Sequence, residues 1–207
     1  MKKYILNYLL SYFFGFFLIF SPLAIAESVL DVTEKDFIVG VENAPITIIE
    51  YASLSCSHCA DFHINTLPEL IKEFVDTGKA RIVFRDFPFN YPALLGSMVL
   101  RCVPEDIRYE YSNALYHLQS KWVLRENAKT TQELYKIMQS GGMTKERFNE
   151  CIDNVDLENE ILHRVMAAQS EFNIKSTPSF LINGILIEGN KTTKEFRQII
   201  DKILSEQ

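Results

Sequence analysis

Cys56 and Cys59 are separated by Ser57 and His58, a spacing that lets the two sulfurs reach bonding distance. Thiol–disulfide exchange needs a thiolate, and a free cysteine is mostly protonated at neutral pH. A helix that begins at this motif would favour the Cys56 thiolate, because its first N–H groups are unpaired and its dipole is positive there. His58 can add positive charge or a donor. Cys56 is therefore the predicted nucleophile, and the deeper Cys59 is predicted to resolve the mixed disulfide.

Stabilisation of the Cys56 thiolate also predicts the direction of electron flow. It stabilises the reduced protein, and a couple whose reduced form is stabilised acts as an oxidant. His58 therefore favours an oxidase over a reductase.

Other roles for the two cysteines are weaker. A Cys-x-x-Cys pair can be half of a zinc site, but the chain has no second such pair, and His63 is a lone further candidate. A c-type haem motif needs His directly after the second cysteine, where Ala60 stands. A purely structural disulfide remains an alternative, although the position at a helix start favours redox use. We expect no metal and no cofactor.

The elements around the motif follow the order strand, helix, strand. Residues 46–51 are mostly β-branched and apolar, as a buried strand is, and residues 81–87 are predicted to form a second strand. Between them, an apolar stripe at helical spacing covers residues 67–75, with Pro68 expected to kink the helix and Gly78 to end it. This order implies a right-handed crossover and a parallel strand pair. The lead-in before the first strand is expected to be short and irregular.

Residues 88–159 contain no predicted strand. Apolar stripes predict helices over 93–100 and 107–122, and Thr144 is expected to begin another. Thr130 and Glu133 have the spacing of a capping box before a further stripe.

The last part of the chain returns to mixed structure. One more helix is predicted over 161–172. Two short apolar runs joined by Asn183-Gly184 then predict a β-hairpin, 179–187. Thr192 and Glu195 form a second capping-box pattern before the final helix.

The N-terminal residues differ from the rest. Lys2 and Lys3 precede an uncharged, largely apolar segment that ends in a small-x-small pattern at Ala26. This is typical of a signal peptide, residues 1–26, that is cleaved after export. An uncleaved membrane anchor is the alternative. Either way we expect the domain outside the cytoplasm, in the periplasm, where disulfides persist.

The cysteine motif with its flanking residues 50–55, the helical insertion and the Thr177-Pro178 pair together resemble the DsbA-like thiol–disulfide oxidoreductases. The resemblance covers residues 36–207. It implies an α/β thioredoxin fold with an inserted helical subdomain. The expected boundaries are 27–90 and 160–207 for the thioredoxin-like domain and 91–159 for the insertion.

The resemblance also implies roles for single residues. Pro178 matches a cis-proline whose loop faces the sulfurs and pairs with substrate backbone. Glu50 matches a buried acid beneath the dithiol that helps to move protons, although an exposed carboxylate at the strand end is an equal alternative. Ser57 stands where the best-known pattern has Pro, and Thr177 where an apolar residue is common. Both positions bear on the redox poise.

The other two cysteines, Cys102 and Cys151, fall in the helical insertion. Neither has the chemistry of a helix start. We expect a structural disulfide between them because the compartment is oxidising; two buried free thiols are the alternative.

The leading hypothesis is a disulfide oxidase that acts on newly exported proteins. The resemblance implies reoxidation by a quinone-linked membrane partner. The alternatives are an exported reductase or isomerase, and a metal-binding or chaperone-like module. The net charge of −6, from 21 Lys and Arg against 27 Asp and Glu, comes without a basic stripe and argues against nucleic-acid binding. We expect a monomer.

Overall fold

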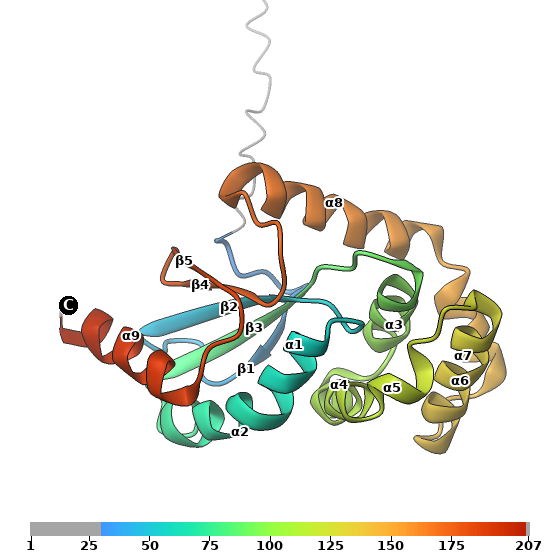
Figure 1. Cartoon of the computed structure of the whole chain (residues 1–207), viewed down its shortest axis with the longest axis horizontal. Coiled ribbons are helices and arrows are strands. Elements are labelled where there is room, and N and C mark those ends of the chain that lie inside the picture. Colours follow the sequence, from blue (N-terminus) through green and yellow to red (C-terminus); the bar gives the residue numbers. More distant parts are fainter. Residues whose placement is uncertain (1–29, 206–207) are drawn as a thin grey trace, which may run out of the picture.

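The computed structural model describes residues 30–205. A five-stranded sheet of order β1-β3-β2-β4-β5 forms its centre, with helices on both faces (Figure 1). The expected signal segment, residues 1–26, lies outside the described residues. In the part of the chain that is described, no helix is both long and apolar enough to cross a membrane.

The sheet confirms the predicted strands and adds one. Its members are β1 (Phe37–Val39), β2 (Ile46–Ala52), β3 (Ala80–Asp86), β4 (Ser179–Ile182) and β5 (Ile185–Glu188). β2 and β3 are parallel, as predicted, and all other neighbours are antiparallel. The expectation of an irregular lead-in was wrong, because β1 pairs there with β3. Three residues are too few to carry a detectable alternation, so the pairing depends on the exposed edge of β3.

The helix after the cysteine motif is continuous and changes its winding. α1 (Ser57–Asp61) leads into the π-helical η1 (Phe62–Thr66), then α2 (Leu67–Leu70) and the π-helical η2 (Ile71–Val75). Pro68 lies in the first positions of α2, directly after η1. The wider π turn accommodates the missing N–H, so the helix continues through the proline.

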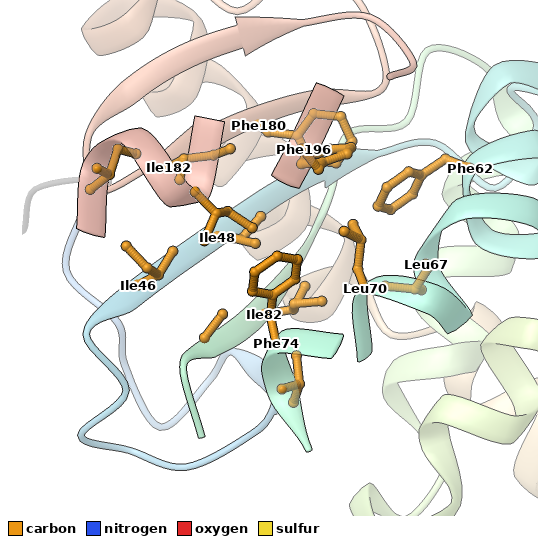
Figure 2. Packing of buried hydrophobic residues seen from close by; sticks show 14 residues of the cluster. Ile46, Ile48, Phe62, Leu67, Leu70, Phe74, Ile82, Phe180, Ile182 and Phe196 are labelled. Atoms are coloured by element: carbon orange, nitrogen blue, oxygen red, sulfur yellow. The ribbon is translucent and has the colours of Figure 1, made fainter. Parts of the chain in front are cut away.

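The two faces of the sheet carry separate cores. On one face, Phe62 packs against Phe180 and against Phe196 of α9 (Thr193–Ser205), with ring centroids 4.8 and 5.6 Å apart (Figure 2). On the other face, Val165 and Ala168 of α8 (Val155–Phe172) are buried against the sheet. Full burial of each large apolar side chain contributes roughly 1.5–3 kcal/mol.

The helical segment packs around its own core beside the sheet (Figure 1). Its elements are α3 (Tyr91–Arg101), the 3-10 turn η3 (Glu105–Ile107), α4 (Arg108–His117), α5 (Gln119–Trp122), α6 (Asn127–Ser140), α7 (Lys145–Ile152) and the start of α8. The boundary expected after residue 159 falls inside α8, which contacts both α3 of the insertion and β3 of the sheet.

At two helix starts the predicted residues form the cap, and at a third they do not. Thr144 caps α7 through its hydroxyl, and Thr192 and Glu195 exchange the two capping-box bonds at α9, as predicted. The capping box expected at Thr130 was wrong. Its buried hydroxyl lies within α6 and bonds to both backbone groups of Leu124, which anchors the preceding loop instead.

The helix predicted over 107–122 is broken at Leu118. The indole N–H of Trp122 donates to the Leu115 carbonyl over 2.9 Å. In a straight helix that carbonyl would accept the N–H of Gln119. The fully buried Trp122 ring therefore holds the break in place, and the side chain of Gln119 is freed to reach the cysteine motif.

Asp36 ties the lead-in to the sheet and to α8. Its carboxylate accepts hydrogen bonds from Arg85 at 2.9 and 2.8 Å and lies 3.0 Å from Arg164. Burial raises the pKa of Asp36, but the hydrogen bonds from Arg85 and from the backbone N–H of Thr33, together with the charges of Arg85 and Arg164, outweigh burial and lower that pKa below its usual value. Removal of one partner of such a buried carboxylate would strongly destabilise the fold.

The structure joins Cys102 and Cys151 in a disulfide that links the end of α3 to α7 across a separation of 49 residues. A cross-link over a loop of this length restricts the unfolded chain and so stabilises the fold.

We expect the C102A/C151A double variant to lose about 2–4 kcal/mol of unfolding free energy, because the cross-link no longer restricts the unfolded state. Urea denaturation of the wild type, with and without prior reduction of all disulfides, provides the control. An unchanged unfolding midpoint in the double variant would contradict a structural role for this bridge.

Candidate active site

The cysteine motif lies where β2 leaves the sheet. Cys56 occupies the N-cap position of α1 in extended conformation, and Cys59 is fully buried one turn later. Both are free thiols in this structure. The side-chain amide of Gln119 donates to the carbonyls of Leu54 and Cys56 at 2.9 and 3.0 Å. The helical segment therefore holds the motif loop in place, a contact that the sequence alone did not reveal.

The surroundings of Cys56 favour its thiolate. A hydrogen bond from the Cys59 thiol is the main cause, and backbone N–H groups of Cys59 and His58 add to it, so that the pKa of Cys56 falls to about 5 despite partial burial. The side chain of Thr177 also lowers this pKa. The Thr177 hydroxyl has no hydrogen-bond partner among the described residues, so it acts on the Cys56 thiolate as a nearby dipole.

Cys59 has the opposite character. Burial raises the pKa of its thiol far above the ordinary value, and the interaction with Cys56 and the charge of Glu50 raise it further. One sulfur is thus ionised and accessible, and the other is protonated and enclosed.

The contribution of residue 58 differs from the expectation. Its imidazole is exposed, and what lowers the Cys56 pKa is the backbone N–H of His58. The helix start was one of the two expected sources of stabilisation and is present; the other, the charge of the His58 side chain, is not among the main causes of the lowered pKa of Cys56.

The Thr177-Pro178 loop faces the cysteines. The peptide bond between the two residues is cis. The Thr177 carbonyl accepts a hydrogen bond from the Cys56 thiol at 3.3 Å, an interaction available only to the protonated form. The loop reaches this position because β4 begins at Ser179, which pairs with Tyr51 near the end of β2.

Glu50 and His63 form a buried pair behind the motif. Both carboxylate oxygens of Glu50 lie 3.1 Å from Nε2 of His63, and both residues are almost completely buried. The alternative of an exposed Glu50 was wrong. The sequence suggests His63 only as a lone candidate zinc ligand, but His63 is the partner of Glu50. Its position directly after the core residue Phe62 was the available signal. Across residues 30–205, no group of three or more His, Cys, Asp or Glu side chains is arranged to hold a metal.

The lowered Cys56 pKa predicts the pH dependence of its reactivity. Alkylation of the reduced protein by iodoacetamide should have a midpoint near pH 5: fast above it, and slower as the pH falls and the thiolate is protonated. The same ionisation stabilises the folded reduced protein fully above about pH 8.5, the pKa of an ordinary cysteine. This stabilisation is lost as the pH falls through about 5.

Cys59→Ala removes the main hydrogen bond to the thiolate and should raise the alkylation midpoint. A wild-type midpoint near that of a free cysteine would contradict the assignment.

A comparison with known protein families gives one match across most of the chain. The family model described as Thioredoxin matches residues 32–202.

Curated relatives agree with this match. A candidate protein-disulfide oxidoreductase of Rickettsia conorii is 30% identical over 182 residues, which cover 85% of this chain and 63% of that protein. Disulfide bond formation protein D of Bacillus subtilis is 23% identical over 174 residues, covering 81% of this chain and 76% of that protein. The chain thus spans 63% to 67% of the length of its rickettsial relatives.

Among solved structures, alpha-DsbA1 of Wolbachia pipientis has a TM-score of 0.80 and 29% identity, with 86% of this chain and 95% of that chain covered. Three observations lead to one conclusion: the fold, the order of the cysteine motif and the cis-proline loop along the chain, and the match of the family model. The chain belongs to the thioredoxin family and is a DsbA-like member of that superfamily.

Proposed function

We propose that this protein is a thiol–disulfide oxidase that donates its Cys56–Cys59 disulfide to other proteins. The observation that carries the proposal is the contrast between the two sulfurs: the pKa of Cys56 is lowered to about 5, and that of the buried Cys59 is raised. A stabilised thiolate lowers the free energy of the reduced protein, and a protein with a stable reduced form gives up its disulfide readily.

The exchange proceeds in two steps. A substrate thiolate attacks the Cys56 sulfur, a substrate–Cys56 bond forms, and Cys59 leaves. A second substrate thiolate then attacks the substrate sulfur of the mixed disulfide, and Cys56 leaves as a stabilised thiolate. Two substrate thiols are oxidised to one disulfide, and the dithiol of the protein holds the two electrons.

The Thr177-Pro178 loop is proposed to position the substrate. Its carbonyl at Thr177 lies 3.3 Å from the attacked sulfur, so an extended peptide that reaches Cys56 must pass along this loop. The accessible sulfur and the exposed Ser57 and His58 leave that side of the motif open.

Export and reoxidation complete the proposal. The N-terminal sequence pattern of residues 1–26 supports export to the periplasm. A membrane partner linked to quinone would remove the two electrons from the reduced dithiol. The name of the Bacillus subtilis relative, a disulfide bond formation protein, supports this direction.

The reduction potential of the Cys56–Cys59 pair tests whether the protein acts as an oxidase or as a reductase. Equilibration of Cys56–Cys59 with glutathione should give a value nearer the oxidising end of the superfamily, about −120 mV, than the reducing end, about −270 mV. A value at the reducing end would favour the alternative of an exported reductase or isomerase and overturn the oxidase proposal.

Two single variants test the roles of the sulfurs. Cys56→Ala should abolish exchange, because the accessible nucleophile is lost. Cys59→Ala should accumulate mixed disulfides with a reactive disulfide substrate, because no resolving thiol remains. Non-reducing mass spectrometry distinguishes the outcomes; mixed disulfides retained by Cys56→Ala would reverse the assignment.

A further inference from the structure

The segment between β5 and α9 is joined to the cis-proline loop. The backbone N–H of Gly189 donates to the carbonyl of Pro178 over 2.9 Å, one residue beyond the paired Ser179 and Glu188. Gly189 has a φ of +79°, a left-handed conformation that glycine adopts without strain and that other residues rarely adopt. The strand ends at this residue, and the chain leaves the sheet beside the loop that faces Cys56.

Asn190 and Asp61 connect the same segment to the helix of the cysteine motif. The side-chain amide of Asn190 donates to Oδ2 of Asp61, the last residue of α1, over 2.5 Å. The other carboxylate oxygen, Oδ1, accepts a hydrogen bond from the amide of Asn65 at 2.7 Å. Each oxygen of Asp61 thus has one N–H donor, and a hydrogen bond to an ionised acceptor is stronger than one between neutral groups.

The Asn190 side chain has no second partner. Its amide oxygen is buried and accepts no hydrogen bond from the described residues, which costs free energy. The neighbouring cation does not take its place, because the ammonium group of Lys191 donates to the carbonyl of Glu188 at 2.8 Å. The bond to Asp61 is therefore the favourable polar contact that the structure gives this side chain.

One further contact strengthens the connection. The hydroxyl of Thr66, which lies in η1 directly after α1, donates to the carbonyl of Lys191 at 3.3 Å. The segment is thus bound to the motif helix at two points and to the cis-proline loop at one. Because Cys56 is the N-cap of that helix and lies 3.3 Å from the Thr177 carbonyl, these bonds join the two sides of the reacting sulfur.

We propose that Asp61 and Asn190 hold the start of α1 at a fixed distance from the Thr177-Pro178 loop, and so act as positioning residues for an extended peptide substrate. The proposal rests on the substrate role proposed above for that loop, but not on the direction of the exchange. A peptide that lies along the loop must bring its own sulfur onto Cys56, and a misplacement of about 1 Å is enough to slow such a reaction strongly.

Asp61 does not act through the charge of Cys56. The lowered pKa of Cys56 comes mainly from the hydrogen bond of Cys59, and Asp61 is not among its main causes. The effect of Asp61 on a substrate therefore comes through the position of the backbone. A small dithiol that touches only the sulfur does not depend on this position, whereas a peptide does.

Asn190→Asp tests the proposal, because it brings two carboxylates together and their repulsion separates the segment from α1. The measured quantities are the second-order rate constants with which an uncharged dithiol peptide and dithiothreitol, which has no peptide backbone, reduce the oxidised protein. We expect the peptide-to-dithiothreitol ratio to fall about fivefold, the usual net contribution of one hydrogen bond. The control is Asn149→Asp, the same substitution at an exposed position of α7, which should keep the wild-type ratio.

The double variant Asp61→Asn/Asn190→Asp provides the rescue. An amide at position 61 can donate to a carboxylate at position 190 and still accept from Asn65, so the connection forms again with the roles exchanged. We expect its ratio to return to within about twofold of the wild type. The alkylation midpoint of Cys56 should stay near the wild-type value in each variant, because Cys59 and the helix start are intact. A purely structural role would change both rate constants together and leave their ratio unmoved.

A wild-type ratio in Asn190→Asp, or a double variant no better than Asn190→Asp, would overturn the proposal. If Asn190→Asp fails to fold, Asn190→Ala replaces it, because it removes the donor without adding a charge; the same fall in the ratio is expected, and an unchanged ratio overturns the proposal. A reducing potential of the wild type would refute the oxidase proposal and leave this one standing. A wild type that reacts with neither dithiol refutes both.

Discussion

The register of the central strand β2 sets the geometry of the site. Its residue Glu50 points into the space behind the motif, and its end delivers the chain to Cys56. On the side of β2 that faces β4, Tyr51 pairs with Ser179, so the Thr177-Pro178 loop lies against the Cys56 sulfur. Side chains alternate along a strand, and a slip of one residue would turn Glu50 to the other face and move the loop away from the cysteine.

The redox chemistry then follows from how the two sulfurs share one hydrogen bond. Cys56 at the helix start is surrounded by donors, whereas Cys59 is enclosed by apolar neighbours and faces the Glu50 charge. The interaction between them stabilises the Cys56 thiolate and the Cys59 thiol together. The protein thereby stabilises its own reduced state.

The helical segment is part of this site. Gln119 holds the motif loop, Tyr116 stacks on His63, and Trp122 packs beneath Leu54. A Cβ added at Gly96 would lie only 2.8 Å from the Trp122 ring and 3.0 Å from Leu54, so the close approach of α3 requires glycine. The insertion thus positions the loop and closes the space behind it, while α8 and the Asp36 ion pairs join it to the sheet.

Local sequence determined the strands β2 to β5, the parallel pair, the hairpin at Asn183-Gly184 and the two cysteines at a helix start, because each depends on near neighbours in the chain. Tertiary structure decided the rest. β1 forms because it can pair with the outer edge of β3. The helix breaks at Leu118 because the indole N–H of Trp122 donates to the carbonyl of Leu115.

The same division holds for the site. The spacing of Cys56 and Cys59 was sufficient to predict thiol–disulfide chemistry. The pairing of Glu50 with His63, thirteen residues apart, and the contact of Gln119 with the motif loop leave no local pattern. Burial and hydrogen bonding between distant residues arise only when the sheet and the helices pack, and these two quantities set the proton affinity of each sulfur.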